Sequence, residues 1–130
     1  MNYYSLNKQA ADVSFKEATI FGQAPDKGLY FPEKLPVLSP EFIQSLSRIS
    51  KNEMAFEVMK PYVGDTIPDS VLQTIVYETL DFDIPLVPVQ TNIASLELFH
   101  GPTLAFKDVG ARFMSRCLGY FSKSLDSKIT

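Results

Sequence analysis

Apolar residues recur over residues 14–80 at the spacing of one helical face, which predicts helices before any motif is considered. Each stripe is expected to be core. The predicted helices run from Ser14 to Phe21, from Ser39 through Ile49 with a stripe of Phe42, Ile43, Leu46 and Ile49, from about Asn52 to Lys60 with Met54, Ala55, Val58 and Met59 facing inward, and from Pro68 to Leu80 with Val71, Leu72, Ile75 and Val76.

Residues at the ends of these stripes support the same helices. Ser14 with Glu17 three residues later has the pattern of a capping box, and Gly22 is a suitable stop. Ser39 followed by Pro40 is typical of an N-cap and the first helical position. The third helix is expected to close before Pro61 and Gly64, because proline and glycine both interrupt helices.

Beyond Leu80 the apolar pattern changes from a helical period to an alternating one. Residues 86–89 and 94–99 are predicted to form a hairpin, whose first strand should be irregular because Pro85 and Pro88 donate no ladder hydrogen bond. Short extended segments are also expected at residues 2–7 and 29–31. The change of period divides the chain into residues 1–85, mainly helical with short strands, and residues 86–130.

The final helix is predicted after Gly101 and Pro102, and a strand is expected to begin at Lys128. Its apolar stripe consists of Val109, Phe113, Cys117 and Phe121, with Met114 and Leu118 flanking it and Arg112, Ser115 and Arg116 on the other face. Helices combined with a few short strands indicate an α/β fold.

Composition narrows the functional classes. With 45% hydrophobic residues and a net charge of −3, and without a basic run interleaved with aromatics, the chain is a globular type for which nucleic acid is not expected as a partner. One cysteine and one histidine make a metal site unexpected. No apolar run approaches membrane-spanning length and the N-terminus lacks a signal-peptide pattern, so the cytoplasm is the expected compartment.

Lys107 is the first candidate for chemistry, since lysine is usually favoured at the other end of a helix. A reactive lysine needs its amine held near an electrophile, with its neutral form populated by desolvation or by a positive field. Phe106 would add a flat face suited to a planar cofactor. On these grounds alone, however, a surface lysine beside a capping Thr103 and Asp108 requires no chemistry.

A resemblance changes that interpretation. The run Leu-Glu-Leu-Phe-His-Gly-Pro-Thr-Leu-Ala-Phe-Lys-Asp at residues 96–108 resembles the pyridoxal-phosphate attachment segment of the threonine synthase family, which belongs to the fold-type-II pyridoxal enzymes. The core at residues 105–108 would fit several relatives, whereas the longer run from Glu97 to Thr103 is more specific. Gly-Leu-Tyr-Phe-Pro at residues 28–32 also resembles an N-terminal segment of the family.

The resemblance implies roles for particular residues. Lys107 is implied to form the Schiff base with pyridoxal 5'-phosphate and to transfer protons as general base and acid. Phe106 is implied to lie against one face of the pyridoxal ring, so these two residues are the expected cofactor site. His100, Thr103 and Asp108 match the motif with supporting roles only, and a hydrogen-bonded histidine near the site is a slightly better explanation of His100 than a catalytic role.

The implied activity is that of a carbon–oxygen lyase, which converts O-phospho-L-homoserine and water to L-threonine and phosphate. Residues 86–130 would then begin the pyridoxal-phosphate-binding catalytic domain. Two alternatives remain: another fold-type-II lyase, such as a related phospho-lyase or a serine/threonine dehydratase, and a non-catalytic fragment or interaction module.

The glycines are dispersed at positions 22, 28, 64, 101, 110 and 119, without the clustered spacing of a phosphate-binding loop. The resemblance covers the opening part of the family's length, so the catalytic domain is expected to be incomplete here. We therefore expect an N-terminal fragment that binds pyridoxal phosphate weakly at best and does not turn over by itself.

Overall fold

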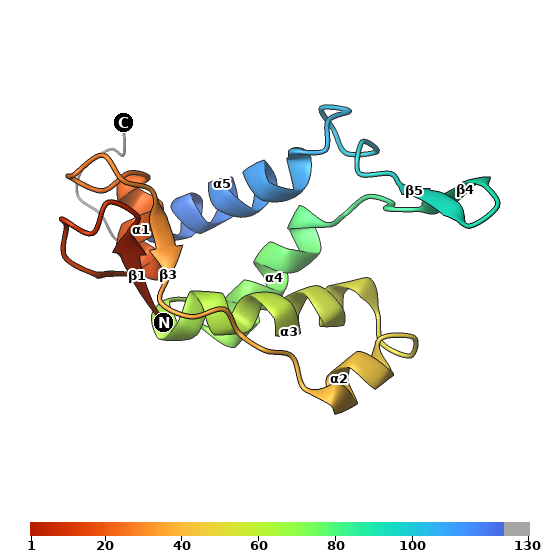
Figure 1. Cartoon of the computed structure of the whole chain (residues 1–130), viewed down its shortest axis with the longest axis horizontal. Helices are drawn as coiled ribbons and strands as arrows, with labels where there is room; N and C mark the ends of the chain where they lie inside the picture. Colours follow the sequence, from red (N-terminus) through yellow and green to blue (C-terminus); the bar gives the residue numbers. More distant parts are fainter. Residues whose placement is uncertain (124–130) are drawn as a thin grey trace.

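The computed structural model describes residues 1–123, and the strand expected from Lys128 lies outside these residues. The described part is an α/β arrangement with a small sheet at one end, helices in the middle and a hairpin that projects at the other end (Figure 1). The predicted fold class is therefore confirmed.

The N-terminal sheet is antiparallel, with strand order β2-β1-β3. Its strands are β1 (Asn2–Ser5), β2 (Val13–Ser14) and β3 (Tyr30–Pro32), of which β2 was not anticipated. Tyr3 on β1 is buried, and its hydroxyl donates a hydrogen bond to the Tyr62 carbonyl at 2.9 Å. This bond ties the sheet to the helix that contains Tyr62.

Helix α1 (Phe15–Phe21) follows β2 directly and begins as predicted. The Ser14 hydroxyl accepts from the Glu17 backbone N–H, and the Glu17 carboxylate accepts from the Ser14 backbone N–H at 2.8 Å, which completes the capping box. Gly22 ends the helix at φ 68°, a conformation that glycine adopts without a Cβ clash.

Helix α2 (Pro40–Ser45) begins with the predicted Ser39 cap, but it is shorter than predicted and its apolar stripe is not core. After Ile43 the backbone switches to i→i−3 hydrogen bonds, with Leu46 N–H donating to the Ile43 carbonyl, and the helix ends. Ile43 is 54% exposed and Leu46 is 37% exposed. The spacing of apolar residues predicts which face of a helix is apolar, but it does not show whether other elements cover that face. In α2 the apolar side chains remain partly exposed.

Helix α3 (Lys51–Val63) runs past Pro61, so the predicted end at Lys60 was wrong. The missing N–H of Pro61 removes one helical bond, but the last turn is held because Val63 is buried at 1% exposure. A single 3₁₀ turn, η1 (Gly64–Thr66), then leads to helix α4 (Asp69–Thr79), whose buried Leu72, Ile75 and Val76 confirm the predicted stripe.

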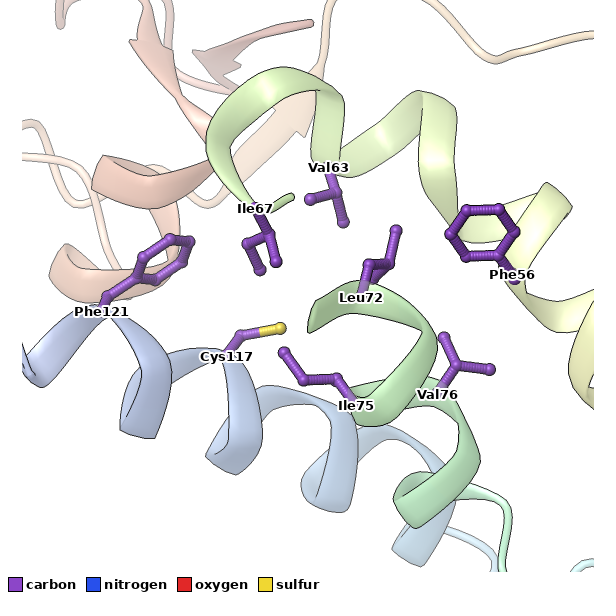
Figure 2. Close-up of a cluster of buried hydrophobic side chains, with 8 residues drawn as sticks. All are labelled: Phe56, Val63, Ile67, Leu72, Ile75, Val76, Cys117 and Phe121. Atoms are coloured by element: carbon purple, nitrogen blue, oxygen red, sulfur yellow. The ribbon is translucent and has the colours of Figure 1, made fainter. Parts of the chain in front are cut away.

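The main core lies between α3, α4 and the last helix, α5 (Asp108–Ser122) (Figure 2). Cys117 and Phe121 of α5 are buried in this cluster, as their stripe predicted, and the Phe121 ring lies edge-on to Phe15 of α1 with centroids 6.2 Å apart. The complete buried set is Phe56, Val63, Ile67, Leu72, Ile75, Val76, Cys117 and Phe121. Burial raises the pKa of the Cys117 thiol to about 12, so this cysteine behaves as a small hydrophobe and not as a nucleophile.

The stripe predicted to be the inner face of α3 lies at the edge of this core. Met54, Ala55, Val58 and Met59 line an apolar hollow of about 330 Å³, with Val76, Thr79 and Leu80 of α4 and Val109, Gly110 and Phe113 of α5 as its other walls. Met54 remains 37% exposed. The apolar period of α3 is thus explained by this hollow more than by the deep core.

The predicted hairpin is formed by β4 (Leu86–Gln90) and β5 (Ile93–Leu96), joined through Thr91 and Asn92. Its register shifts between Pro88 and Gln90, which confirms the irregularity expected from the prolines. The hairpin stands apart from the helices (Figure 1). Within residues 1–123, no helix is long and apolar enough to cross a bilayer.

Candidate functional site

The segment singled out in the sequence is the loop from Glu97 to Lys107 that joins β5 to α5. Lys107 occupies the N-cap position of α5 with φ −70° and ψ −7°, and its side chain is exposed. Its carbonyl accepts the Ala111 N–H at 2.9 Å, so the lysine backbone already belongs to the first turn. The predicted position of Lys107 at the helix start is confirmed.

The side chains next to the lysine are also exposed. Phe106 is 71% exposed and Leu104 is 77% exposed, so the aromatic ring that was expected to face a planar ligand is available. Among residues 1–123, none makes a hydrogen bond or an ion pair with the Lys107 amine. In the described part of the chain, the Lys107 amine is therefore without a partner and the adjacent Phe106 side chain is largely exposed.

Asp108 behaves differently from its neighbours, because it is buried at 3% exposure. Its Oδ1 accepts the Thr103 hydroxyl at 2.6 Å, and its Oδ2 accepts the Thr103 backbone N–H at 2.9 Å. These hydrogen bonds, first that from the hydroxyl, hold the pKa of the Asp108 carboxyl below its usual range, and the charges of Arg112 and Lys107 lower it further.

The expectation that Thr103 caps the helix is wrong. Helix α5 has no side-chain cap, and the Thr103 hydroxyl donates to Asp108 when a cap would have to accept from a backbone N–H. The reason is local: Leu104 adopts φ 56°, a left-handed conformation that folds Thr103 back toward Asp108. The preference of threonine for N-cap positions gave no indication of the left-handed turn at Leu104.

Gly101 lies directly against the Asp108 side chain. A Cβ built on Gly101 would approach Asp108 Oδ2 to 2.5 Å and Asp108 Cβ to 2.9 Å, distances that real side chains do not tolerate. Gly101 is itself buried, and its carbonyl accepts the Leu104 N–H at 3.0 Å. Only glycine therefore allows the loop to close this tightly on Asp108.

His100 is hydrogen-bonded within the loop. Its Nε2 lies 2.7 Å from Glu97 Oε2, and its ring stacks on Phe99 with centroids 4.8 Å apart. His100 points to a partner three residues before it, so the interpretation of a hydrogen-bonded histidine near the site agrees with the geometry. Residues 1–123 contain no group of three or more metal-ligating side chains.

Two interactions had not been predicted. One is the hydrogen bonding of Asp108 to Thr103. Its only sign in the sequence was that a threonine precedes Lys107 and an aspartate follows it. The other involves Arg112, expected on the polar face, whose guanidinium donates to the carbonyls of Thr79 and Glu78 at the end of α4. Arg112 thereby fixes the start of α5 against α4.

Solved structures share the fold of this chain. The chain superposes on the structure of threonine synthase from Escherichia coli with a TM-score of 0.88 at 35% identity, and the match covers 94% of this chain and 28% of that one. A structure of PLP-bound threonine synthase from Brucella melitensis gives a TM-score of 0.91 at 37% identity over 95% of this chain and 28% of that one. The α/β fold is that of the N-terminal part of a fold-type-II pyridoxal-phosphate enzyme.

The sequence comparisons are more specific. Residues 2–80 match the family model described as threonine synthase N terminus. The threonine synthase of Buchnera aphidicola subsp. Baizongia pistaciae is 37% identical over 131 residues, a match that covers 100% of this chain and 30% of the relative. The chain belongs to the threonine synthase family, and it spans about 30% of the length of such relatives.

Proposed function

We propose that this chain is the part of a threonine synthase that supplies the cofactor lysine. In this proposal the whole protein converts O-phospho-L-homoserine and water to L-threonine and phosphate, as a carbon–oxygen lyase of the cytoplasm. The observation that carries the proposal is the exposed Lys107 at the start of α5, with its amine unpaired among residues 1–123 and Phe106 beside it.

The described residues fit one part of a pyridoxal 5'-phosphate site. A lysine amine without a competing ion pair is suited to covalent attachment of an aldehyde, and an aromatic ring that is 71% exposed is suited to cover a planar heterocycle. Lys107 and Phe106 are the residues of this chain that would hold the cofactor. A relative whose structure is described as PLP-bound supports this assignment.

When bound, pyridoxal phosphate supplies the electron sink that stabilises negative charge next to the substrate nitrogen. The contribution of this chain is proton transfer and placement. Lys107 Nζ would take and return protons at the substrate carbons, a task that requires an amine free to change its partner. Phe106 would keep water from one face of the site.

We also propose that residues 1–85 form an N-terminal unit and that residues 86–130 begin the catalytic domain. The end of the family model at residue 80 supports this division. Because α5 shares its core with α3 and α4, the start of the catalytic part would be anchored directly on the N-terminal helices.

The proposal is tested by exchanging the matching N-terminal part of the E. coli relative for this chain and measuring phosphate release from O-phospho-L-homoserine. The chimera should release phosphate and form threonine, and K107R should abolish both, since arginine cannot form the covalent link. K34R is the control: it replaces an exposed lysine that is distant from Lys107 in the sequence, and it should keep full activity. A folded chimera that stays active with K107R would overturn the proposal.

A further inference from the structure

The loop that leads to Lys107 is held by hydrogen bonds to the side chain of the next residue, Asp108. Asp108, immediately after Lys107, reaches back across the loop and accepts both hydrogen bonds that Thr103 donates, at 2.6 and 2.9 Å. Two backbone hydrogen bonds shape the same segment: the Leu104 N–H donates to the Gly101 carbonyl at 3.0 Å, and the Asp108 N–H donates to the Ala105 carbonyl at 3.1 Å. Residues 101–104 and 105–108 thus form two consecutive turns, and the Asp108 carboxylate in the second turn is hydrogen-bonded to Thr103 in the first.

Ordinary helix capping does not account for this use of Asp108. An aspartate in the first turn usually stabilises a helix because its carboxylate accepts hydrogen bonds from the free backbone N–H groups of that turn and interacts favourably with the helix dipole. Here α5 has no side-chain cap, although Asp108 is in its first turn, and both Asp108 carboxylate oxygens accept hydrogen bonds from Thr103. The carboxylate is directed to the loop and not to the helix.

The surrounding backbone is adapted to this contact. Leu104 is held at φ 56°, a left-handed conformation that is strained for leucine, and Gly101 leaves no room for a Cβ beside Asp108. Strained residues persist where the surrounding structure over-determines them, often at sites of ligand contact. Between the bonded ends, Lys107 and Phe106 remain exposed.

We propose that Asp108 is a positioning residue for Lys107. Its carboxylate closes the loop through Thr103 and so fixes the direction in which the lysine side chain leaves the start of α5. The inference rests on the proposed function only for what Lys107 does; the order that Asp108 imposes on the loop is a property of this chain alone.

The test measures backbone order in the chain without cofactor, by ¹⁵N relaxation. D108N keeps the shape of the side chain but replaces one acceptor by a donor, so one Thr103 donor loses its partner. T103V removes the hydroxyl bond alone, and T103S restores it. T74V is the matched control, because the Thr74 hydroxyl donates to the Ser70 carbonyl at 3.1 Å on α4, away from the loop.

In the wild type, order parameters for residues 104–107 should be near those of rigid backbone, about 0.85. In D108N and T103V they should fall toward about 0.6 or below, while those of Val109 to Phe121 stay unchanged. T103S and T74V should match the wild type. If D108N does not fold, T103V alone decides. Unchanged order at residues 104–107 in T103V or a folded D108N, or loss of order throughout α5, would overturn the inference.

A second measurement separates this inference from the proposed function. Each variant is incubated with pyridoxal phosphate, reduced with borohydride and digested, and label at Lys107 is compared with label at Lys34. Preferential label at Lys107 that falls several-fold in T103V and returns in T103S supports both proposals. Preferential label unaffected by T103V overturns the positioning role. Equal label at both lysines in the wild type counts against the proposed function, and the relaxation data still decide the role of Asp108.

Discussion

Gly101 and Gly119 are two glycines with opposite surroundings. An added Cβ at Gly101 would meet the Asp108 side chain at 2.5 Å, whereas nothing lies within 4 Å of one at Gly119, inside α5. G101A should therefore lower the free energy of unfolding by about 1–3 kcal/mol through steric strain. G119A should raise it by about 0.5–1 kcal/mol, because alanine has the higher helix propensity.

Urea denaturation of the two variants and the wild type measures this difference. Both substitutions add one methyl group, so their opposite signs cannot come from composition. Equal stability of G101A and the wild type would show that Gly101 does not lie against Asp108 as the structure has it.

The Asp108 carboxylate should also make stability depend on pH. Its pKa is lowered in the folded state, first by the Thr103 hydroxyl, so the carboxylate stabilises the fold fully above the unfolded value of about 3.9 and loses this effect as pH falls through the folded value. The difference in unfolding free energy between wild type and D108N should be constant near neutrality and shrink below about pH 4.

Urea titrations of both proteins at several pH values between neutrality and acid provide that measurement. The other acidic groups are common to both proteins, so their titration cancels in the difference. A difference that grows as the pH falls would mean that Asp108 does not gain hydrogen bonds on folding.

Single residues were predictable where their partners are local. Ser14 with Glu17 formed the expected capping box because the interaction spans three residues of one turn. The same reasoning failed for Thr103, whose partner is set by the left-handed turn at Leu104, and propensity does not favour leucine in that conformation. The position of Lys107 at a helix start followed from the pattern, but the carboxylate that closes its loop did not.

At the scale of elements, α5 is attached to α4 through Arg112. The guanidinium donates to the Thr79 carbonyl at 3.1 Å and to the Glu78 carbonyl, two groups left unpaired at the end of α4, and it lies 5.7 Å from the Phe82 ring. R112A should lower the unfolding free energy by about 1–3 kcal/mol, since charged hydrogen bonds to the end of a helix are lost.

Thermal or urea unfolding of R112A, R112K and R48A tests this role. R112K keeps the charge but not the fork of donors and should fall between the wild type and R112A. Arg48 is exposed in the turn after α2, and R48A should change stability by no more than about 0.5 kcal/mol. An R112A protein as stable as R48A would contradict the capping role.

Element identity was predicted better than element ends. Helices α3 and α4 and the hairpin were expected, because their apolar periods are long and clear. Pro61 suggested an end to α3 that the burial of Val63 prevents, and the stripe of α2 suggested a longer helix than the exposed Ile43 and Leu46 support. In each case tertiary packing, which period and propensity do not contain, decides the boundary.

At the scale of the whole molecule, one helical core connects the N-terminal region to the lysine loop. Cys117 and Phe121 in the second half of α5 belong to the buried cluster that residues of α3 and α4 also form, so the helix that begins at Lys107 is anchored in this core (Figure 2). The hairpin that precedes the loop has exposed apolar side chains, with Leu86 and Leu96 at 67% and 58% exposure. The sequence predicted that the helical stripes form the core, but it did not indicate that the apolar side chains of the hairpin are exposed.

The proposed function depends above all on Lys107 being the lysine to which the cofactor attaches. The most direct measurement is a peptide map of the chain after incubation with excess pyridoxal phosphate and borohydride reduction, which traps even weak attachment as a stable label. We expect the label on the peptide that contains Lys107 to be well above the label on any other lysine peptide, and we expect it to be lost in K107R. Label spread evenly over the lysines, or concentrated on a lysine other than Lys107, would contradict it.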